Sequence, residues 1–385
     1  MSFDFELSSD QILVRDTVRT FAEEVLKPRA AAFDRSREFP IDNYRRAAEL
    51  NLTGMMVPEE YGGAGFDAVS YVIAIEEISR ACASTGVILS VNNSLVCGPL
   101  LRFGTEEQKR TYLVPHARGE RLGAYCLTEP GAGSDAAALK TRAVKRGDRY
   151  VLNGNKVFVT NGVAADTFLV YATLDPSLGH RGICTFIVER SFPGLRMGKP
   201  ERKMGITCSG SVEVVFDDCE VPASNLLGPE GEGFKIAMKT LDGGRIGIAS
   251  QALGIGRAAL EESLAYSKNR EAFGAPIAKL QAIQWKLADM ATELDAARLL
   301  TYRAAWTRDQ TGRGSLEASM AKLFASEACM RAATQAVQIH GGYGYIDEFI
   351  VERLFRDAKI TEIYEGTSEI QRLVIAKEIL KRSGA

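Results

Sequence analysis

The sequence predicts an α+β protein in three successive parts: an N-terminal all-α domain (residues 1–120), a middle antiparallel β-barrel domain (121–228) and a C-terminal four-helix bundle (229–385). Three observations support this prediction. Apolar residues recur at helical spacing in the first part. β-Branched residues alternate between Gly, Asn and Asp turns in the middle, and helical spacing returns after the Gly- and Pro-rich stretch "LLGPEGEGF". Long helices do not alternate with the expected strands, so a parallel βαβ sheet is not expected.

The N-terminal part carries two helix-start signals. Ser8 and Gln11 have the spacing of a capping box, and Thr105 and Gln108 repeat it. Between them, "VSYVIAIEEISRACAS" (69–84) is apolar on more than one side, which predicts a helix buried on several faces. These features predict a helical domain with its own core.

The middle part shows strand patterns separated by turn residues. Strands are expected at residues 150–162, 166–174, 182–190 and 211–221. The turn signals are "KRGDR" (145–149) and "NGN" (153–155). We expect an antiparallel barrel or sandwich of roughly 100 residues.

The C-terminal part has the apolar spacing of packed helices. Its clearest stripe repeats at intervals of three and four: Leu280, Ile283, Leu287, Met290, Leu294 and Ala297. A second long helix is expected over 315–342, ended by paired glycines. A last helix follows the stretch "ITEIYEGTSEIQR" (360–372).

Charge and composition limit the possible partners. The chain has 47 basic and 49 acidic residues, a net charge of −2, and 46% hydrophobic residues. This balance gives no reason to expect nucleic acid or an anionic membrane as a partner. No apolar run of the ~18 residues needed for a membrane span is expected, and the acidic start "MSFDFELSSDQ" does not resemble a signal peptide. We therefore expect a cytoplasmic protein, or a mitochondrial matrix protein if a transit peptide has been removed.

The cysteines and histidines do not form a metal-ligand pattern. Seven cysteines are scattered without a C-x-x-C pair, and there are three histidines. Buried free thiols in a reducing compartment fit this pattern better than disulfides or zinc, so no metal is expected. The sequence also lacks G-x-G-x-x-G, G-x-x-x-x-G-K-[ST], H-E-x-x-H and G-x-S-x-G. The sequence therefore lacks the motifs that are typical of Rossmann dehydrogenases, P-loop enzymes, zincins and lipase-type hydrolases.

Two stretches of the middle part are candidates for ligand contact. In "AYCLTEPGAGSD" (124–135), Thr128 and Ser134 offer hydroxyls, and the glycines allow a close backbone approach. In "KVFVTNG" (156–162), Phe158 and Thr160 should share one face of a strand, because side chains alternate. A turn and a core aromatic explain the same residues, and spacing alone favours that interpretation.

Two further candidates lie in the helical part. Arg270, in "NREAFGAPIAKLQAIQ", stands at a junction between helices where it could clamp a phosphate or merely cap a helix end. In "LDGGRIG" (241–247), two glycines at the expected start of a long helix cost up to ~1 kcal/mol each relative to Ala. Something should need the space they leave, and Asp242 and Arg245 share a face and could pair.

The stretch 360–372 places a carboxylate at a helix break. Glu365 precedes a glycine and follows two apolar residues, an environment that would raise the pKa of its carboxyl group toward that of a useful base. Ser368 and Gln371 have the spacing of a capping box for the last helix, whose free amides could receive ligand oxygens. A solvent-facing glutamate is the commoner fate of a single Glu.

Together these stretches resemble the acyl-CoA dehydrogenase family over the whole chain. "YCLTEPGAGSD", "NREAFGAPIAKLQ", "QIHGGYGY" and "IYEGTSEIQR" occur in the family's order and spacing. "SVNNSL" and "LDGGRIGIASQALGIG" look closest to short-chain, butyryl-CoA-type members. The resemblance implies the family fold, non-covalent FAD and a homotetramer built as a dimer of dimers.

The resemblance also implies roles for individual residues. Glu365 matches the catalytic base. Residues matching the flavin contacts are Tyr125, Leu127, Thr128, Gly133, Ser134, Phe158, Val159 and Thr160. Those matching contacts drawn from a neighbouring subunit are Arg270, Phe273, Gln281, Gln338, Ile339, His340, Gly341 and Gly342. Thr367, Ser368 and Glu369 match residues beside the cofactor's ribose and adenine. Residues matching the acyl-CoA contacts are Ser134, Asp242, Gly243, Gly244, Arg245 and Gly366.

The implied activity is the α,β-dehydrogenation of a short-chain acyl-CoA to the trans-2-enoyl-CoA. Glu365 would remove the α-proton, flavin N5 would take the hydride, and an electron-transfer flavoprotein would accept the electrons. One branch of the family carries its base where this chain has Gly244, so Glu365 is the candidate from either branch. Phe158 stands where many relatives have Trp, and flavin packing should survive this change. Branched or cyclic acyl-CoA substrates fit the same machinery, and a non-catalytic scaffold is the remote alternative.

Overall fold

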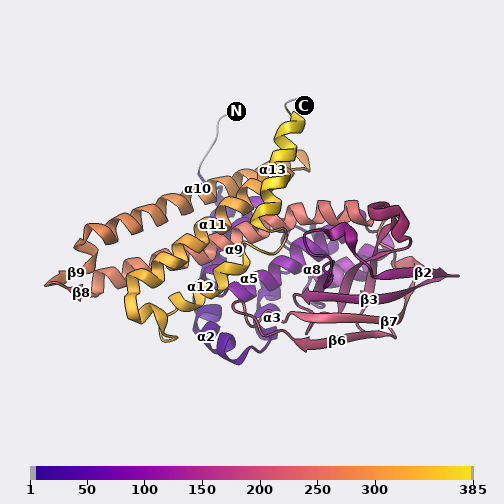
Figure 1. Ribbon diagram of the computed structural model, residues 1–385, viewed down its shortest axis with the longest axis horizontal. Helices are drawn as coiled ribbons and strands as arrows, with labels where there is room; N and C mark the ends of the chain where they lie inside the picture. The colour runs from indigo at the N-terminus through magenta and orange to yellow at the C-terminus, as the bar shows by residue number, and fades with distance from the viewer. Residues whose placement is uncertain (1–5, 383–385) are drawn as a thin grey trace.

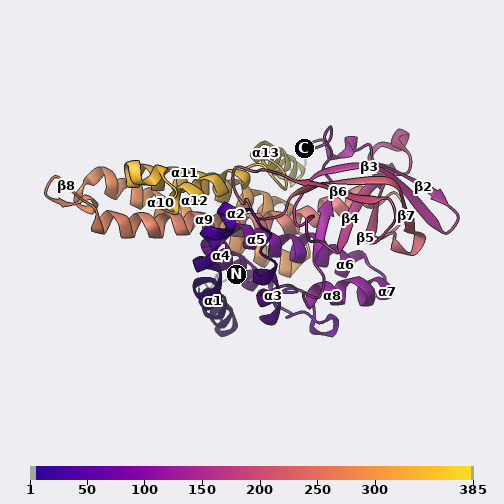
Figure 2. The same ribbon diagram turned by 90° about the horizontal axis from the view of Figure 1, so that it is seen from below.

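The structure is a computed structural model that describes residues 6–382. The molecule is elongated: a curled sheet lies at one end, and long helices extend from beside it toward a small hairpin at the other end (Figure 1). The N-terminal helices pack along one side of the long helices, as the turned view shows (Figure 2). The predicted order of a helical part, a β-part and a helical bundle is confirmed.

The N-terminal part consists of short helices. They are α1 (Ser9–Phe21), α2 (Lys27–Ser36), α3 (Ile41–Glu49), α4 (Ala68–Ala81), α5 (Ala83–Ser90), α6 (Gly98–Phe103), α7 (Glu106–Gln108) and α8 (Val114–Ala117). Both capping boxes are present, with Ser8 and Thr105 as the capping residues. The predicted buried helix is α4, which ends where Cys82 turns extended at φ −153°. A π-helical stretch, Val91–Cys97, follows α5 and later forms part of the site.

One helical run differs from the expectation about membrane spans. Ala83–Phe103 covers 21 residues with a mean hydropathy of 1.2, enough by length and composition to cross a membrane. In the structure 89% of its apolar window is buried inside the protein. The run is therefore packed as a core element of the folded chain.

The middle part is a seven-stranded sheet. Its strands are β1 (Gly123–Cys126), β2 (Arg142–Arg146), β3 (Arg149–Val159), β4 (Thr167–Thr173), β5 (Ile183–Glu189), β6 (Leu195–Pro200) and β7 (Val212–Pro222). The order is β1-β4-β2-β3-β7-β6, with β5 paired to β4. The strands predicted at 150–162, 166–174, 182–190 and 211–221 are confirmed as β3, β4, β5 and β7, whereas β1, β2 and β6 lie outside those four ranges. The sheet is mixed, because β1 pairs parallel with β4 through a connection long enough to contain the β2–β3 hairpin.

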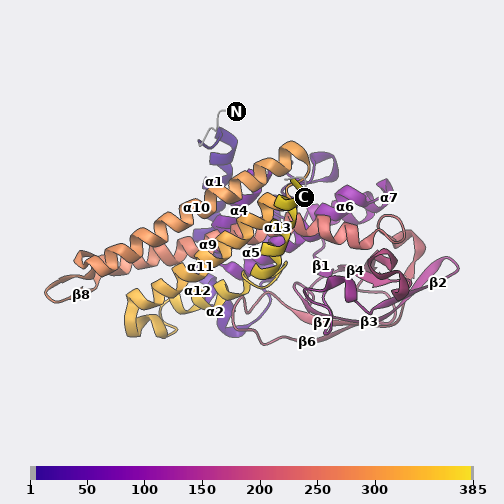
Figure 3. The same cartoon turned by 45° about the horizontal axis from the view of Figure 1, so that its top comes forward.

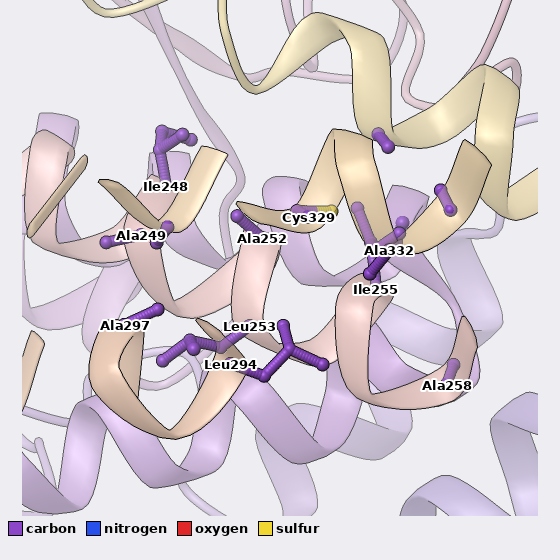
Figure 4. Close-up of a cluster of buried hydrophobic side chains, with 14 of the residues drawn as sticks. Ile248, Ala249, Ala252, Leu253, Ile255, Ala258, Leu294, Ala297, Cys329 and Ala332 are labelled. Carbon is purple, nitrogen blue, oxygen red and sulfur yellow. The ribbon is translucent and has the colours of Figure 1, made fainter. Parts of the chain in front are cut away.

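The C-terminal part is built on long helices. They are α9 (Gly233–Asn269), α10 (Gln281–Thr311), α11 (Ser315–His340), α12 (Val351–Ile360) and α13 (Ser368–Arg382), with the hairpin strands β8 (Glu271–Ala272) and β9 (Ala275–Pro276) between α9 and α10. Small residues such as Ala249, Ala252 and Ala332 let α9 and α11 approach closely, and Leu294 of α10 fills the space beside them (Figure 4). The tilted view shows α13 beside α11, near the junction with the sheet (Figure 3).

Two expectations about these helices need correction. Helix α9 begins at Gly233, so the glycine pair 243–244 lies in the helix interior and not at its start. Leu280 precedes α10 and is 37% exposed, whereas Met290, Leu294 and Ala297 of the same stripe are buried. Ile283 and Leu287 are partly buried against the same core, so the stripe packs from Ile283 onward.

Candidate active site

A cavity of about 270 Å³ lies where the three parts of the chain meet. The π-helical stretch contributes Val91 and Leu95, β1 contributes Tyr125, and α9 contributes Leu241 and Arg245. Ten of the residues singled out from the sequence line it: Tyr125, Leu127, Thr128, Gly133, Ser134, Phe158, Thr160, Arg245, Glu365 and Gly366. The fold thus brings together segments that are 275 positions apart in sequence, from Val91 to Gly366.

Glu365 occupies a strained turn between α12 and α13. Its φ is 54° and that of Gly366 is 94°, so both residues lie in the left-handed region, which is unfavourable for a glutamate. Buried donors hold the turn: Lys322 Nζ donates to the Gly366 carbonyl at 2.8 Å, and Gln371 Nε2 donates to the same oxygen at 2.8 Å. Gln371 Nε2 also donates to the Glu365 carbonyl at 3.2 Å. The surrounding structure therefore imposes the conformation that points the carboxylate inward.

One oxygen of the Glu365 carboxylate is buried without a hydrogen-bond partner, although the residue as a whole is half-buried at the cavity wall. Its Oε2 atom accepts no hydrogen bond from any described residue. Burial raises the pKa of Glu365 to about 8, against the opposing charges of Lys322 and Arg245. A carboxylate that lines a cavity, has an oxygen without a partner and has a raised pKa is a candidate proton acceptor for a bound ligand.

The glycine pair of α9 explains how the carboxylate fits. A Cβ at Gly244 would lie 1.9 Å from Glu365 Oε2 and 2.9 Å from a Leu95 methyl carbon. At Gly243 the nearest atom would be 3.7 Å away, on Arg308. The space that the sequence predicted at this pair is thus occupied, at Gly244, by the carboxylate itself.

The start of α13 differs from the prediction. The Ile370 amide donates to Thr367 Oγ1 at 3.3 Å, so Thr367 is the capping residue. Ser368 Oγ is buried without a partner, and the Gln371 side chain points back to the turn carbonyls. The predicted capping box of Ser368 and Gln371 is therefore wrong, because Gln371 is used to hold the Glu365 turn.

The loop after β1 is fixed by a buried ion pair that the sequence did not reveal. Lys156 Nζ lies 2.7 Å from Glu129 Oε1 and donates to the Leu127 carbonyl at 3.1 Å. Glu129 also accepts the amides of Lys140 and Thr141 at 2.6 and 2.9 Å. The pKa of Glu129 is lowered, since these hydrogen bonds and the Lys156 charge outweigh the opposing effect of its burial. The loop that lines the cavity is thereby held from behind.

Phe158 and Thr160 both line the cavity, but not for the predicted reason. The register of β3 against β7 shifts between Lys156 and Val159, and Phe158 has φ 59°. Simple alternation is therefore broken by a bulge. Phe158 is 68% exposed, while Val159 points into the sheet core at 2% exposure.

A second cavity of about 430 Å³ gathers another group of predicted residues. Arg270, Ile339, His340, Gly341 and Gly342 line it. The His340 ring stacks on Tyr266 at 4.1 Å, and the Arg270 guanidinium lies 5.6 Å from the Tyr343 ring centre. This cavity is near the β8–β9 end of the molecule, away from the sheet (Figure 1). Phe273, at the tip of that hairpin, is 93% exposed.

A third cavity, of about 650 Å³, adjoins the other side of α9. It contains the predicted residues Asp242 and Gly243, and Asp242 pairs with Arg245 at 2.9 Å. Its basic lining residues, none of them singled out from the sequence, are Arg102, Lys239, Arg308, Arg313, Lys381 and Arg382. Their positions on four separate helices and the α10–α11 loop leave no local sequence signal.

The remaining predicted residues stand apart from these cavities. Gln281 and Gln338 line none of the three, and the segment Thr367–Glu369 lies just beyond the cavity residue Gly366. Among the described residues no group of three or more His, Cys, Asp or Glu side chains could hold a metal ion, and all seven cysteines are free and buried.

Comparisons with known proteins identify the class. Profiles of the acyl-CoA dehydrogenase N-terminal, middle and C-terminal domains match residues 8–120, 124–219 and 231–380. The chain therefore belongs to the acyl-CoA dehydrogenase family.

Individual relatives in the family are similar to this chain over nearly its whole length. The short-chain specific acyl-CoA dehydrogenase of Clostridium acetobutylicum is 50% identical, over 98% of this chain and 100% of its own. The mitochondrial short-chain specific enzyme of Mus musculus is 54% identical, over 98% of this chain and 91% of its own.

Solved structures of related proteins have the same fold as this chain. Butyryl-CoA dehydrogenase from Megasphaera elsdenii superposes with a TM-score of 0.96 at 46% identity, over 98% and 100% of the two chains. A chain from a study of the electron transferring flavoprotein of Acidaminococcus fermentans gives 0.97 at 50% identity, over 98% and 100%. A FAD complex of PigA gives 0.95 at 30% identity, over 99% and 100%.

Proposed function

We propose that this protein uses FAD to oxidise a short-chain acyl-CoA to the trans-2-enoyl-CoA, with Glu365 as the base. The observation that carries the proposal is the Glu365 carboxylate at the wall of a cavity shared by all three parts of the chain. Its Oε2 atom is buried and has no hydrogen-bond partner, and the pKa of Glu365 is raised to about 8. The relatives at 50–54% identity, described as short-chain specific acyl-CoA dehydrogenases, support the substrate class.

The residues of the cavity fit a flavin. Cβ atoms placed at Gly131 or Gly133 would meet nothing within 4 Å, so the loop backbone faces open space. The Thr128 and Thr160 residues and the apolar Phe158 line the same space, which suits a flat ring with polar edges. FAD, when bound there, supplies the two-electron acceptor that takes the β-hydrogen as hydride at N5.

The turn at Glu365 performs the proton chemistry. An ionised Glu365 carboxylate facing the cavity is placed to remove the α-proton of a thioester, whose acidity rises when its carbonyl oxygen is stabilised. The Glu365 N–H donates to no acceptor among residues 6–382, so it is free to donate to that oxygen. A bound acyl chain excludes water from the cavity and so keeps the carboxylate basic.

The two cavities beside α9 suit an extended ligand with an anionic end. Val87, Val91 and Leu95 give the Glu365 cavity an apolar wall for a short acyl chain. Asp242 and Gly243 line the neighbouring cavity, whose basic residues would attract the phosphates of CoA. We propose that Ser134, Arg245 and Gly366 contact the thioester part of the ligand, where it runs from one cavity to the other.

The second cluster of predicted cofactor residues supports a homo-oligomer. Arg270 and Gly341–Gly342 are far from Glu365 in one chain, yet a guanidinium, stacked aromatics and open glycines suit a pyrophosphate and an adenine. Exposed Phe273 and Trp285, at 93% and 64%, would be covered by a second chain. We infer a homotetramer in which this cluster completes a neighbour's FAD site, with Gln281 and Gln338 nearby.

The electrons leave through a redox partner. We propose an electron-transfer flavoprotein, supported by the structural relative from the study of that protein in Acidaminococcus fermentans. The exposed Phe158 marks the side of the cavity from which the partner would approach. The free, buried cysteines fit a reducing compartment, in keeping with a cytoplasmic enzyme.

The substitution Glu365→Gln tests the assignment. The variant should fold, keep its yellow FAD and bind butyryl-CoA, yet lose flavin reduction by ~10²-fold or more, since an amide cannot accept the proton. Anaerobic bleaching of the flavin by butyryl-CoA measures this directly. Near-normal bleaching in the variant would show that another group is the base.

A further inference from the structure

Lys322 is a wholly buried lysine whose charge is not matched at contact distance. Its side chain is 0% exposed on α11, and its hydrogen bond within the described chain is to the Gly366 carbonyl at 2.8 Å. No carboxylate of the described residues lies within ion-pair distance of its ammonium. A buried cation with only a neutral partner is costly, so a reason for its presence is needed.

The position of Lys322 relative to the base gives that reason. Its acceptor oxygen belongs to the residue directly after Glu365, which fixes the ammonium next to the strained turn. Burial lowers the pKa of Lys322 to about 8, while Glu365 is the largest influence that raises it. In the same way, Lys322 is the largest influence lowering the pKa of Glu365. Each group therefore favours the charged form of the other and offsets part of the effect of its burial.

We propose that Lys322 is a positioning residue for Glu365: its ammonium anchors the Gly366 carbonyl, and its buried positive charge favours the ionised carboxylate, which is the form that accepts a proton. This rests on the proposed function of Glu365. Lys322 does not reach the cavity lining, so it acts through the turn and through its charge.

Other groups also face this pair. Arg245 approaches Glu365 from α9, Tyr125 from β1 and Tyr71 from α4, and Tyr364 precedes it in the chain. Lys322 in turn faces Glu362 and Glu369, of which Glu362 is paired with Lys359 at 2.6 Å and Glu369 is exposed. Arg245 is already bound to Asp242, which leaves Lys322 as the cation that has no carboxylate partner of its own.

The substitution Lys322→Met removes the charge with little change in volume, and Gln371 remains to hold the Gly366 carbonyl. In the holoenzyme, the pH midpoint for flavin reduction by butyryl-CoA should move upward by about one unit, with a ~10-fold loss near neutral pH that recovers at alkaline pH. A merely structural lysine would lower the rate at every pH with an unchanged midpoint, and that result would overturn the proposal. Lys359→Met is the matched control: it removes a half-exposed lysine from the same region and should leave the midpoint in place.

A second readout is independent of catalysis. In urea unfolding of the holoenzyme, Lys322→Met should unfold earlier than wild type. The double variant Lys322→Met/Glu365→Gln should recover much of the loss, because it no longer has to protonate a carboxylate, or bury it in its charged form, when it folds. If Lys322→Met alone does not fold, recovery of yellow, folded protein in the double variant supports the coupling, and failure of both contradicts it. Bleaching by Glu365→Gln alone would refute the base assignment, whereas an unshifted midpoint in Lys322→Met would refute only the role of Lys322.

Discussion

Two glutamates, each with a buried lysine nearby, show how the same residue types serve different purposes. Glu129 receives a lysine and two backbone amides at 2.6–2.9 Å, and its pKa is lowered. Glu365 has an orphaned Oε2 atom, its lysine is bound to a neighbouring carbonyl, and its pKa is raised to about 8. A satisfied carboxylate fixes a loop, whereas an unsatisfied one is available for chemistry.

The largest effect should come from breaking the satisfied pair. Lys156→Met leaves the buried Glu129 charge without its cation, which should lower the free energy of unfolding by about 3–5 kcal/mol. Denaturant unfolding of the holoenzyme measures the loss. The fraction that folds should keep the wild-type pH midpoint of flavin reduction. A stability change below ~1 kcal/mol would mean that the pair is not a structural clamp.

The unsatisfied carboxylate should instead respond to crowding. Gly244→Ala places a methyl group where Glu365 Oε2 lies, at 1.9 Å, so the carboxylate must swing away and flavin reduction should fall by ~10-fold or more. Gly243→Ala gives the same gain in helix propensity with 3.7 Å of room, and so isolates the steric effect on the rate of reduction. Equal rates in the two variants would show that the carboxylate does not rest against Gly244.

The contrast also shows what the sequence could and could not predict. Local patterns predicted the strands, the long helices, the helix break at Glu365 and the need for space at the glycine pair. They could not show that this space belongs to Glu365, because the two segments are about 120 positions apart and meet only in the packed fold. Local rules also failed where tertiary contacts overrode them: Gln371 left its expected cap to hold the turn, and a bulge re-aimed Phe158.

The lysines were the residues that local patterns missed entirely. Lys156 stands in a strand and Lys322 in a helix, where a lysine ordinarily faces water. Each is buried because a partner from a distant segment, Glu129 or the Gly366 carbonyl, reaches it. Motif reasoning therefore found the groups that would touch a ligand, but not the groups that set their charge and position.

The smallest expected effect is on the pH dependence of stability, because the pKa shifts of Glu365 and Glu129 have opposite signs. The folded-state pKa of Glu365 is above its ordinary value, so the folded protein retains a proton that the unfolded chain loses, and stability falls as pH rises from about 4.5 to about 8. Glu365→Gln removes this penalty, so its advantage in melting temperature over wild type should grow by about 3 °C or more between pH 5 and pH 9. The folded-state pKa of Glu129 is below its ordinary value, so its contribution is complete above that value and is lost only in acid. Glu129→Gln should therefore be less stable than wild type by a constant amount over the same range. Parallel melting curves for both variants would show that the two carboxylates do not differ in charge state as the structure implies.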